Sequence, residues 1–177
     1  CLQEVVIEIK KDGHVIPNDF DLLELPSNFK CYSFKTGSSE WCNGSIQASF
    51  GVATIIDTNI FDSEECSHLN KFYYDLIHPS ILIKCTEKST KETFYLLNVH
   101  APFNDSNNIH EQINKLKNSL PSFCKLLVCG DFNRDMSLIT HKLKIPSRVH
   151  VSENASYAAR TDEQMDDIFR LETIKDT

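Results

Sequence analysis

Seven consecutive residues carry the strongest structural signal in this chain: Leu127-Val128-Cys129-Gly130-Asp131-Phe132-Asn133. The apolar run Leu126–Cys129 predicts a short buried strand. We expect Gly130 to end that strand and to bend the backbone, so that Asp131 and Asn133 emerge at the strand's end. At the carboxyl end of a strand in an α/β sheet, a carboxylate can hold a metal or a water, and an amide can donate to a phosphoryl oxygen. Taken alone, these residues are equally compatible with a Gly-Asp turn that Asn133 caps.

Two other apolar segments carry a polar group at one end. Glu4 stands just before the apolar residues Val5–Ile7, and its carboxylate needs water, a cation or a donor because burial without a partner is costly. His100 follows the apolar run Tyr95–Val99, and Pro102 then stops strand pairing. A single histidine at a strand end is most often structural. Three strands that end in Glu, His and Asp-x-Asn form a convergent pattern, which is what an active site requires.

These segments resemble, in the same order, motifs of the endonuclease/exonuclease/phosphatase superfamily. The matching stretches are Leu2-Gln3-Glu4, Asn98-Val99-His100-Ala101-Pro102 and Gly130-Asp131-Phe132-Asn133. A weaker match is Gln164-Met165-Asp166-Asp167-Ile168-Phe169, which is similar to the family's Arg-Ile-Asp-Tyr-Ile-Phe strand, with Asp166 at the acidic position. The family includes deoxyribonucleases, abasic-site endonucleases, inositol polyphosphate 5-phosphatases and neutral sphingomyelinases. The resemblance implies an α/β fold of two packed β-sheets flanked by helices, a four-layer sandwich, in a single domain over residues 1–177.

The chain also departs from the family pattern at both ends. Members have a strand with an asparagine before the Leu-Gln-Glu motif, whereas this chain begins at Cys1. They also have a Ser-Asp-His motif near the end, and no such motif follows Phe169. We therefore interpret the domain as incomplete at both termini rather than as a degenerate homologue. We expect the chain as given to have little or no activity.

The resemblance implies a role for each candidate residue. Glu4 is expected to bind Mg²⁺, with Mn²⁺ as an alternative, because Mg²⁺ prefers oxygen ligands and often uses only one or two carboxylates. Asp131 is expected to orient and deprotonate the attacking water, and Asn133 to hold the phosphate or that water. His100 is expected to contact the scissile phosphate or to serve the leaving group. Asp166 would orient the histidine of the missing Ser-Asp-His motif, so its role here stays open.

Three functions remain as alternatives at this stage. The first is a Mg²⁺-dependent phosphodiesterase, a deoxyribonuclease-like endonuclease that acts on DNA rather than RNA. The second is a phosphatase or phospholipase of the same superfamily, acting on inositol or lipid phosphoesters. The third is a catalytically dead domain that binds a partner. The motif pair Asn-Val-His-Ala-Pro and Gly-Asp-Phe-Asn-Arg-Asp favours the first, and the acidic composition favours the second.

The composition is that of an ordinary soluble domain with an acidic balance. Hydrophobic residues make up 41% and charged residues 24% of the 177 residues, which is typical of globular proteins. No apolar run approaches the roughly 20 residues that a membrane span needs. The net charge of −7 argues against broad, high-affinity binding to nucleic acid, which depends on cationic side chains. It leaves room for an enzyme that meets DNA through Mg²⁺ and a local basic patch.

Cysteine usage favours an intracellular, cytoplasmic location over secretion. None of the seven cysteines has Cys-x-x-Cys spacing or a zinc-type Cys/His spacing. Most lie in apolar strand-like runs, where cysteine behaves as a small buried hydrophobe: Cys31, Cys85, Cys124 and Cys129. Cys42 and Cys66 lie in polar segments and are candidates for a disulfide. Three glycosylation sequons, which begin at Asn43, Asn104 and Asn154, keep secretion open.

Periodicity predicts a mixed chain of strands and helices. Predicted strands cover residues 5–9, 29–34, 46–56, 80–85, 93–99, 126–129 and 165–169, with a bulge at Gly51 in the third. The clearest helix covers 109–120, and shorter ones are expected at 18–25 and 137–143. Residues 35–44 and 57–70 are predicted to be irregular. The order between His100 and Asp131 is strand–helix–strand, and the mix of elements suggests an α/β sandwich.

Overall fold

The structure is a computed structural model that describes residues 1–16, 24–43, 46–66, 80–101, 109–132, 147–151 and 166–172. Within these ranges the elements follow in the order β1 (Leu2–Lys11), β2 (His14–Ile16), β3 (Phe29–Asn43), β4 (Ile46–Asp57), β5 (Phe61–Glu65), β6 (Ser80–Glu87), β7 (Thr93–His100), α1 (Ile109–Ser119), β8 (Lys125–Asp131), β9 (Ser147–Val151) and β10 (Asp166–Glu172).

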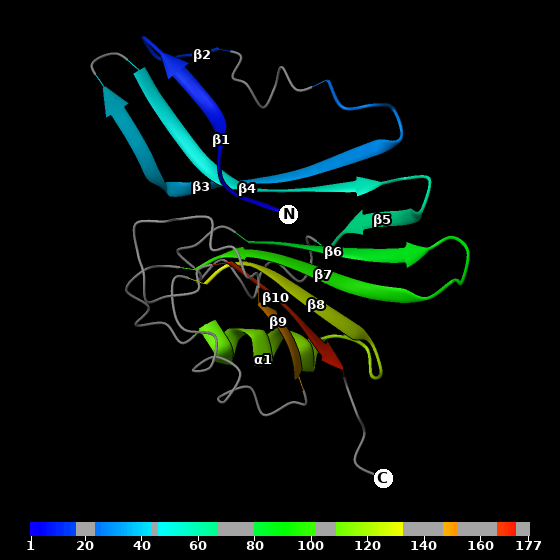
Figure 1. Ribbon diagram of the computed structural model, residues 1–177. Coiled ribbons are helices and arrows are strands. Elements are labelled where there is room, and N and C mark those ends of the chain that lie inside the picture. The colour runs from blue at the N-terminus through cyan, green and yellow to red at the C-terminus, as the bar shows by residue number, and fades with distance from the viewer. Residues whose placement is uncertain are drawn as a thin grey trace.

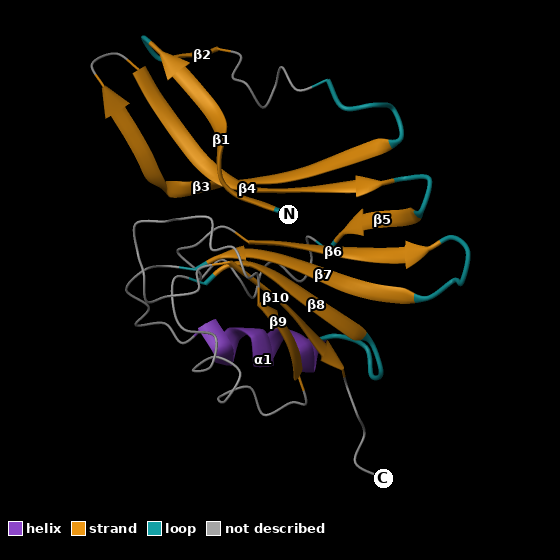
Figure 2. Cartoon of the chain, viewed as in Figure 1, coloured by secondary structure: helices purple, strands orange, loops and turns teal. Residues whose placement is uncertain are grey.

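The strands form two stacked sheets, and α1 covers the outer face of the second sheet (Figure 1). The first sheet has the order β2-β1-β4-β3, and all of its pairs are antiparallel. The second has the order β5-β6-β7-β8-β10-β9, in which β7 and β8 are parallel. Figure 2 shows three successive layers, strand, strand and helix. The predicted α/β architecture of two packed sheets is confirmed, and of the flanking helices predicted in the four-layer sandwich, the described residues contain α1. Most of the helix predicted at 18–25, and all of that predicted at 137–143, lie outside the described residues.

Two apolar clusters occupy the two faces of the second sheet. Between the sheets lie Tyr32, Val52, Ile56, Ile81, Ile83, Cys85, Leu96 and Cys129. Between the second sheet and α1 lie other buried residues, including Leu97, Val99, Leu126, Val128, Ile109, Ile113 and Leu116. The period of two along β7 and β8 therefore separates the side chains. Even-numbered residues of β7 and odd-numbered residues of β8 face the first sheet.

Helix α1 connects the two parallel strands, as its spacing predicts. Ile109, Ile113 and Leu116 are buried on one face of the helix, at the three- and four-residue intervals of an amphipathic helix. Glu111 in the first turn and Lys117 in the last turn have the signs that the helix dipole favours. In the described part of the chain this is the only helix, and it is too short and too polar to cross a membrane.

Two predictions about the first sheet are wrong. Residues 35–43, expected in a loop, continue β3, and their ladder with β4 is irregular between Lys35 and Glu40. The predicted bulge at Gly51 is in fact carried by the neighbouring strands, because Gly51 itself pairs with Val5 on one side and Lys35 on the other. A Cβ at this position would lie 2.1 Å from the carbonyl oxygen of Phe34, so glycine permits the close approach. Strand β5 was likewise missed in a segment expected to be irregular.

Gly130 does not end its strand, contrary to the prediction. Strand β8 continues through Gly130 to Asp131, and Gly130 pairs with Val99 of β7. Its φ is +152°, and a Cβ there would lie 1.8 Å from the Val99 carbonyl oxygen. The residue is therefore glycine because β7 and β8 approach closely beside the strand ends.

The cysteines agree in part with the predictions. Cys85 and Cys129 are buried, whereas Cys31 and Cys124 are only half-buried. Cys66 is buried in the core beneath the second sheet and forms no disulfide, so the predicted pairing with Cys42 is wrong. The segment around Cys66 was interpreted as polar, but the Cys66 side chain, directly after the end of β5, lies in the apolar core.

Brief alkylation of the native protein with iodoacetamide at about pH 8 should leave Cys66, Cys85 and Cys129 largely unmodified. Burial raises the pKa of Cys85 to about 11 and that of Cys129 to about 12, and it also raises the pKa of Cys66. Because only the thiolate reacts, these groups are protonated and shielded at that pH. Mass spectrometry should find all three modified after unfolding, and exposed Cys1 modified in both states. A Cys66 that resists alkylation in denaturant until it is reduced would contradict the absence of a disulfide.

Candidate functional site

Three of the predicted site residues lie side by side at one end of the second sheet. His100 and Asp131 are register partners at the ends of the parallel strands β7 and β8. Asp166, the first residue of β10, is the register partner of Asp131 on its other side. The pairing extends one residue further, since the Ala101 amide donates to the Asp131 carbonyl oxygen at 2.7 Å. We call His100, Asp131 and Asp166 the strand-end row.

Within the strand-end row, His100 and Asp131 belong to the face of the sheet that looks toward the first sheet. Asn98, two residues before His100, and Cys129, two residues before Asp131, both contact the start of β1. Alternation along a strand returns every second residue to the same face. His100 and Asp131 are half-buried, so they lie where the layer between the sheets opens to solvent.

Asn98 connects this face to the first sheet through its side-chain amide. Its Nδ2 shares its two hydrogens among the Leu2 carbonyl oxygen at 3.2 Å, the Ala53 carbonyl oxygen at 2.9 Å and the Thr54 Oγ1 at 3.2 Å. Its Oδ1 accepts a hydrogen bond from Gln3 Nε2 at 2.7 Å. The amide thereby joins β7 to both β1 and β4. Sequence reasoning gave Asn98 no firm role, although an amide inside an apolar strand signals a need for buried partners.

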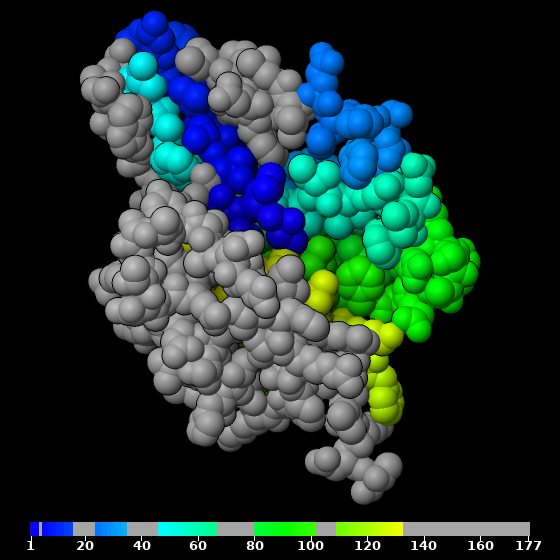
Figure 3. Space-filling model, in the orientation of Figure 1, coloured from blue at the N-terminus to red at the C-terminus, as the bar shows by residue number. Residues whose placement is uncertain are grey.

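Glu4 lies within β1 rather than just before an apolar strand, because β1 already begins at Leu2. The β1–β4 register passes from the pair Leu2–Ala53 to the pair Val5–Gly51, so β1 contains one residue more than β4 over this interval. Such a bulge bends a strand and re-aims side chains, and bulges are frequent beside active sites. Figure 3 shows the start of β1 (dark blue) at the surface beside atoms of the second sheet (green and yellow).

A thiol pair brings the start of β1 to β8 as well. The Sγ atoms of Cys1 and Cys129 lie 2.7 Å apart. Asn98 and Cys129 are neighbours in the β7–β8 register, so β1 crosses over both strands one alternation before the strand-end row. The backbone of Glu4 is therefore anchored close to the strands that carry His100 and Asp131.

Part of the predicted set lies beyond the described atoms. The structure describes the backbone of Glu4 and Asp166 but not their side chains, and Asn133 lies outside the described residues. Asn133 directly follows Phe132, which is fully buried. The backbone register unites three of the five predicted residues, and the convergence of all five side chains stays a prediction.

The donor chemistry of these residues fits Mg²⁺. Among the described side chains there is no cluster of three or more histidine, cysteine or acidic residues. Mg²⁺ does not need one, because it is commonly held by one or two carboxylates and completes its octahedron with water and substrate oxygens. Glu4 and Asp131 offer carboxylate oxygens of that kind.

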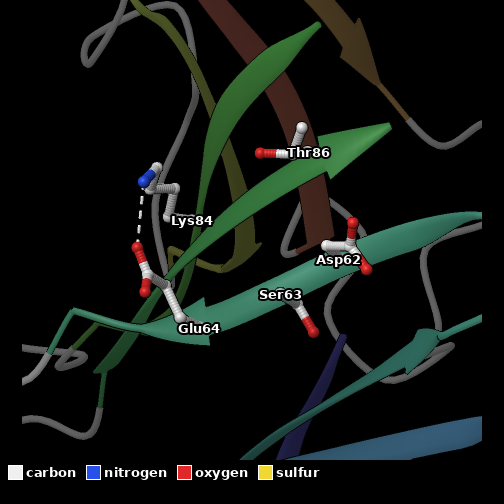
Figure 4. Close-up of a pocket in the computed structure, with 5 residues that line it drawn as sticks. All are labelled: Asp62, Ser63, Glu64, Lys84 and Thr86. Carbon is white, nitrogen blue, oxygen red and sulfur yellow. Dashed lines mark hydrogen bonds and ion pairs between the residues drawn. The ribbon is translucent and has the colours of Figure 1, made fainter. Parts of the chain in front are cut away.

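A surface hollow of about 230 Å³ lies elsewhere, on the edge strand β5 and its neighbour β6 (Figure 4). It is lined by Asp62, Ser63, Glu64, Lys84 and Thr86. Lys84 is paired there with Glu64 at 2.9 Å, and both side chains are exposed, which makes the pair energetically weak. The hollow's lining residues Lys84 and Thr86 pair with Tyr95 and Thr93 of β7 rather than with the end of that strand at His100, and the one lining cation of the hollow already has a partner. We do not assign it to the site.

Comparison with known proteins finds likeness in structure but not in sequence. No protein-family model matches the chain, and no curated protein sequence matches it significantly. The endonuclease domain of TRAS1, a telomere-specific non-LTR retrotransposon, superposes with a TM-score of 0.53 at 11% identity over 80% of this chain. A mannosyl-6-phosphatase from Bacteroides thetaiotaomicron gives 0.50 at 13% identity over 82%. An endonuclease/exonuclease/phosphatase family protein from Leptotrichia buccalis gives 0.52 at 12% identity over 98%.

The chain spans less than two thirds of the first two of these structures, 64% of the endonuclease domain and 63% of the phosphatase, and 74% of the Leptotrichia protein. At these identities the likeness concerns the fold. This chain therefore shares the fold of these proteins, one of which is described as an endonuclease/exonuclease/phosphatase family protein.

Proposed function

We propose that this chain, which has the endonuclease/exonuclease/phosphatase fold, forms the catalytic fold of a Mg²⁺-dependent phosphodiesterase of the deoxyribonuclease-like endonuclease type. The observation that carries the proposal is the strand-end row, in which an imidazole and two acidic residues occupy register-matched positions on three adjacent strands. A base, an acid and metal-ligating carboxylates are the groups that phosphodiester hydrolysis needs. An endonuclease domain is among the structures that share the fold.

In the proposed reaction Asp131 accepts a proton from the attacking water while the oxygen of that water bonds to phosphorus. The bond between phosphorus and the leaving oxygen breaks on the opposite side, and that oxygen takes up a proton. His100, in the neighbouring register position, contacts the scissile phosphate or delivers that proton. Asn133 holds the phosphate or the water by its amide. Asp166 is the register neighbour of Asp131, and no step is assigned to it.

Glu4 is the residue that would hold Mg²⁺, and Mn²⁺ suits the same oxygen donors. A bound Mg²⁺ would supply charge stabilisation for the phosphoryl oxygen and the leaving oxyanion. The bulge at Gln3–Glu4 and the Asn98 contacts support this assignment, because they fix the backbone of Glu4 beside β7.

DNA is the proposed substrate, and RNA is the less favoured nucleic acid. The net charge of −7 implies a small footprint on the duplex, since broad contact with phosphates requires many cationic side chains. The same acidity favours a second candidate, a phosphatase or phospholipase that acts on an inositol or lipid phosphoester. A phosphatase with the same fold makes that candidate concrete.

The protein expressed from its complete gene should nick plasmid DNA in the presence of Mg²⁺. EDTA should abolish the reaction, and excess Mg²⁺ should restore it, because the charge on the leaving group is otherwise unstabilised. Agarose-gel conversion of supercoiled to open-circular plasmid measures the effect, and phosphate release from a phosphoinositide panel runs in parallel. Turnover of the phosphoinositides alone would favour the second candidate. Turnover of neither substrate, or turnover unaffected by EDTA, would contradict a metal-dependent hydrolase and favour a binding domain.

A further inference from the structure

We propose that Asn98 is a positioning residue that clamps the Gln3–Glu4 bulge of β1 onto β7 and so sets the place of Glu4 relative to His100. The consequence for catalysis rests on the proposed function. The clamp itself rests on the hydrogen bonds of a single buried amide.

The Asn98 side chain is fully buried and fully engaged. Its exposure is 0%, and both its oxygen and its nitrogen have partners on the opposite sheet. Its neighbours on the same face, Leu96 and Cys129, belong to the apolar cluster between the sheets. Loss of the amide would leave several buried polar groups without partners, which costs more than loss of one exposed hydrogen bond. The polar side chain of Asn98 is therefore tolerated in this apolar layer because its oxygen and nitrogen are both hydrogen-bonded to the first sheet.

The contacts of Asn98 fall at one of the irregularities of the first sheet. The β1–β4 ladder is irregular between Leu2 and Val5, which is the interval that contains Glu4. Asn98 binds the Leu2 carbonyl oxygen and the Gln3 amide, the two groups directly before Glu4. These bonds come from the other sheet, so they hold the bulge against β7 rather than against β4.

The same residue is joined to the strand-end row through β7. Asn98 and His100 are two residues apart on one strand, roughly 7 Å along its length. A shift of β1 relative to Asn98 therefore changes the separation between Glu4 and His100 directly. Groups that orient a metal ligand typically change metal affinity or activity about 10- to 100-fold when removed.

The central experiment compares Asn98→Leu with Ile83→Ala. Ile83 is fully buried between the same two sheets and pairs in register with Leu96 of β7, so its variant loses packing but keeps the hydrogen bonds of Asn98. Hydrogen–deuterium exchange should become faster in residues 2–6 of the Asn98 variant, selectively over the rest of the protein. The Mg²⁺ concentration for half-maximal activity should rise about 10- to 100-fold. The Ile83 variant should lose stability with an unchanged Mg²⁺ requirement.

Two milder variants keep the test decisive if Asn98→Leu does not fold. Gln3→Leu removes the donor to Asn98 Oδ1 from the partly exposed side, and it should raise exchange in β1 and the Mg²⁺ requirement in the same direction. Thr54→Val removes the bond from Asn98 Nδ2 and the long 3.9 Å contact with Cys1 Sγ. It leaves the bonds of Asn98 to Leu2 and Gln3 in place, so it should change neither. Equal behaviour of the Gln3 and Thr54 variants would overturn the clamp.

Failure of the clamp and failure of the proposed function give different results. A wild-type protein that hydrolyses no phosphoester would refute the function, and exchange together with Mn²⁺ binding followed by electron paramagnetic resonance would still test the clamp. An Asn98→Leu variant that matches Ile83→Ala in exchange, metal binding and Mg²⁺ requirement would show that Asn98 only stabilises the fold. Selective loosening of residues 2–6 with weaker metal binding supports the positioning role.

Discussion

Asp131→Ala should lower the rate of phosphodiester hydrolysis by about 10²–10⁴-fold, the usual loss when a positioned general base is removed. Asp131 lies between His100 and Asp166 in the register, so its loss affects the centre of the strand-end row. The loss should fall mainly on kcat, because the base acts on the water rather than on substrate binding. Plasmid nicking at saturating Mg²⁺, with the melting temperature as a check on folding, measures it.

Asp62→Ala is the matched control for that experiment. Asp62 is an exposed aspartate at the far edge of the same sheet, in an ion pair with Lys88 at 3.4 Å. Its replacement should leave the rate unchanged and the stability within about 0.5 kcal/mol, as for most surface substitutions. If the Asp131 variant retained the activity of the Asp62 variant, the assignment of the base would be wrong.

Gly130→Ala should destabilise the protein by about 3 kcal/mol or more, at the upper end for an overpacked position. The added Cβ would lie 1.8 Å from the Val99 carbonyl oxygen. That atom is backbone in the adjacent parallel strand, so relief requires the two central strands to separate. For a domain of this size the loss corresponds to a fall of roughly 6–12 °C in melting temperature. Thermal and urea unfolding followed by circular dichroism measure both quantities.

Comparison of Gly13→Ala with Gly130→Ala separates the effect of steric crowding by a new Cβ from the effect of the unusual backbone angle. Gly13 has a φ of +79°, but no atom lies within 4 Å of a Cβ built there. Its replacement should cost only the conformational penalty, about 1–2 kcal/mol. Equal losses in the two variants would mean that the close approach of β7 and β8 contributes nothing beyond the unusual backbone angle.

The elements that sequence predicts well are those that local patterns define. The β6–β7 hairpin and helix α1 follow from alternation, a polar turn and helical spacing within short windows. Gly130 was misinterpreted because a glycine after an apolar run looks like a strand end, whereas its cause is the approach of a strand 31 residues earlier, at Val99. The polar continuation of β3 was missed because its pairing with β4 outweighs its composition.

The candidate site also contains features that local sequence predicts and features that it does not. His100 and Asp131 follow apolar runs, so their positions at strand ends could be predicted from local sequence. Their adjacency in the register is set by the parallel pairing of β7 and β8 in the structure. The amide network of Asn98 could not, because its partners are Gln3, Ala53 and Thr54, which are 44 or more residues away along the chain. Only the stacking of the two sheets determines which groups meet that side chain.

The crossing of β1 over β7 and β8 has a consequence for how the molecule folds. The unit β7–α1–β8 can assemble from nearby segments, whereas β1 meets it across 95 residues at Gln3–Asn98 and 128 residues at Cys1–Cys129. Closing such long loops has a large entropic cost, which is recovered only after both sheets exist. Attachment of the amino-terminal strand is thus expected to be a late folding event. Substitutions in this contact should then accelerate unfolding more than they slow folding, since they act on interactions that form after the rate-limiting barrier.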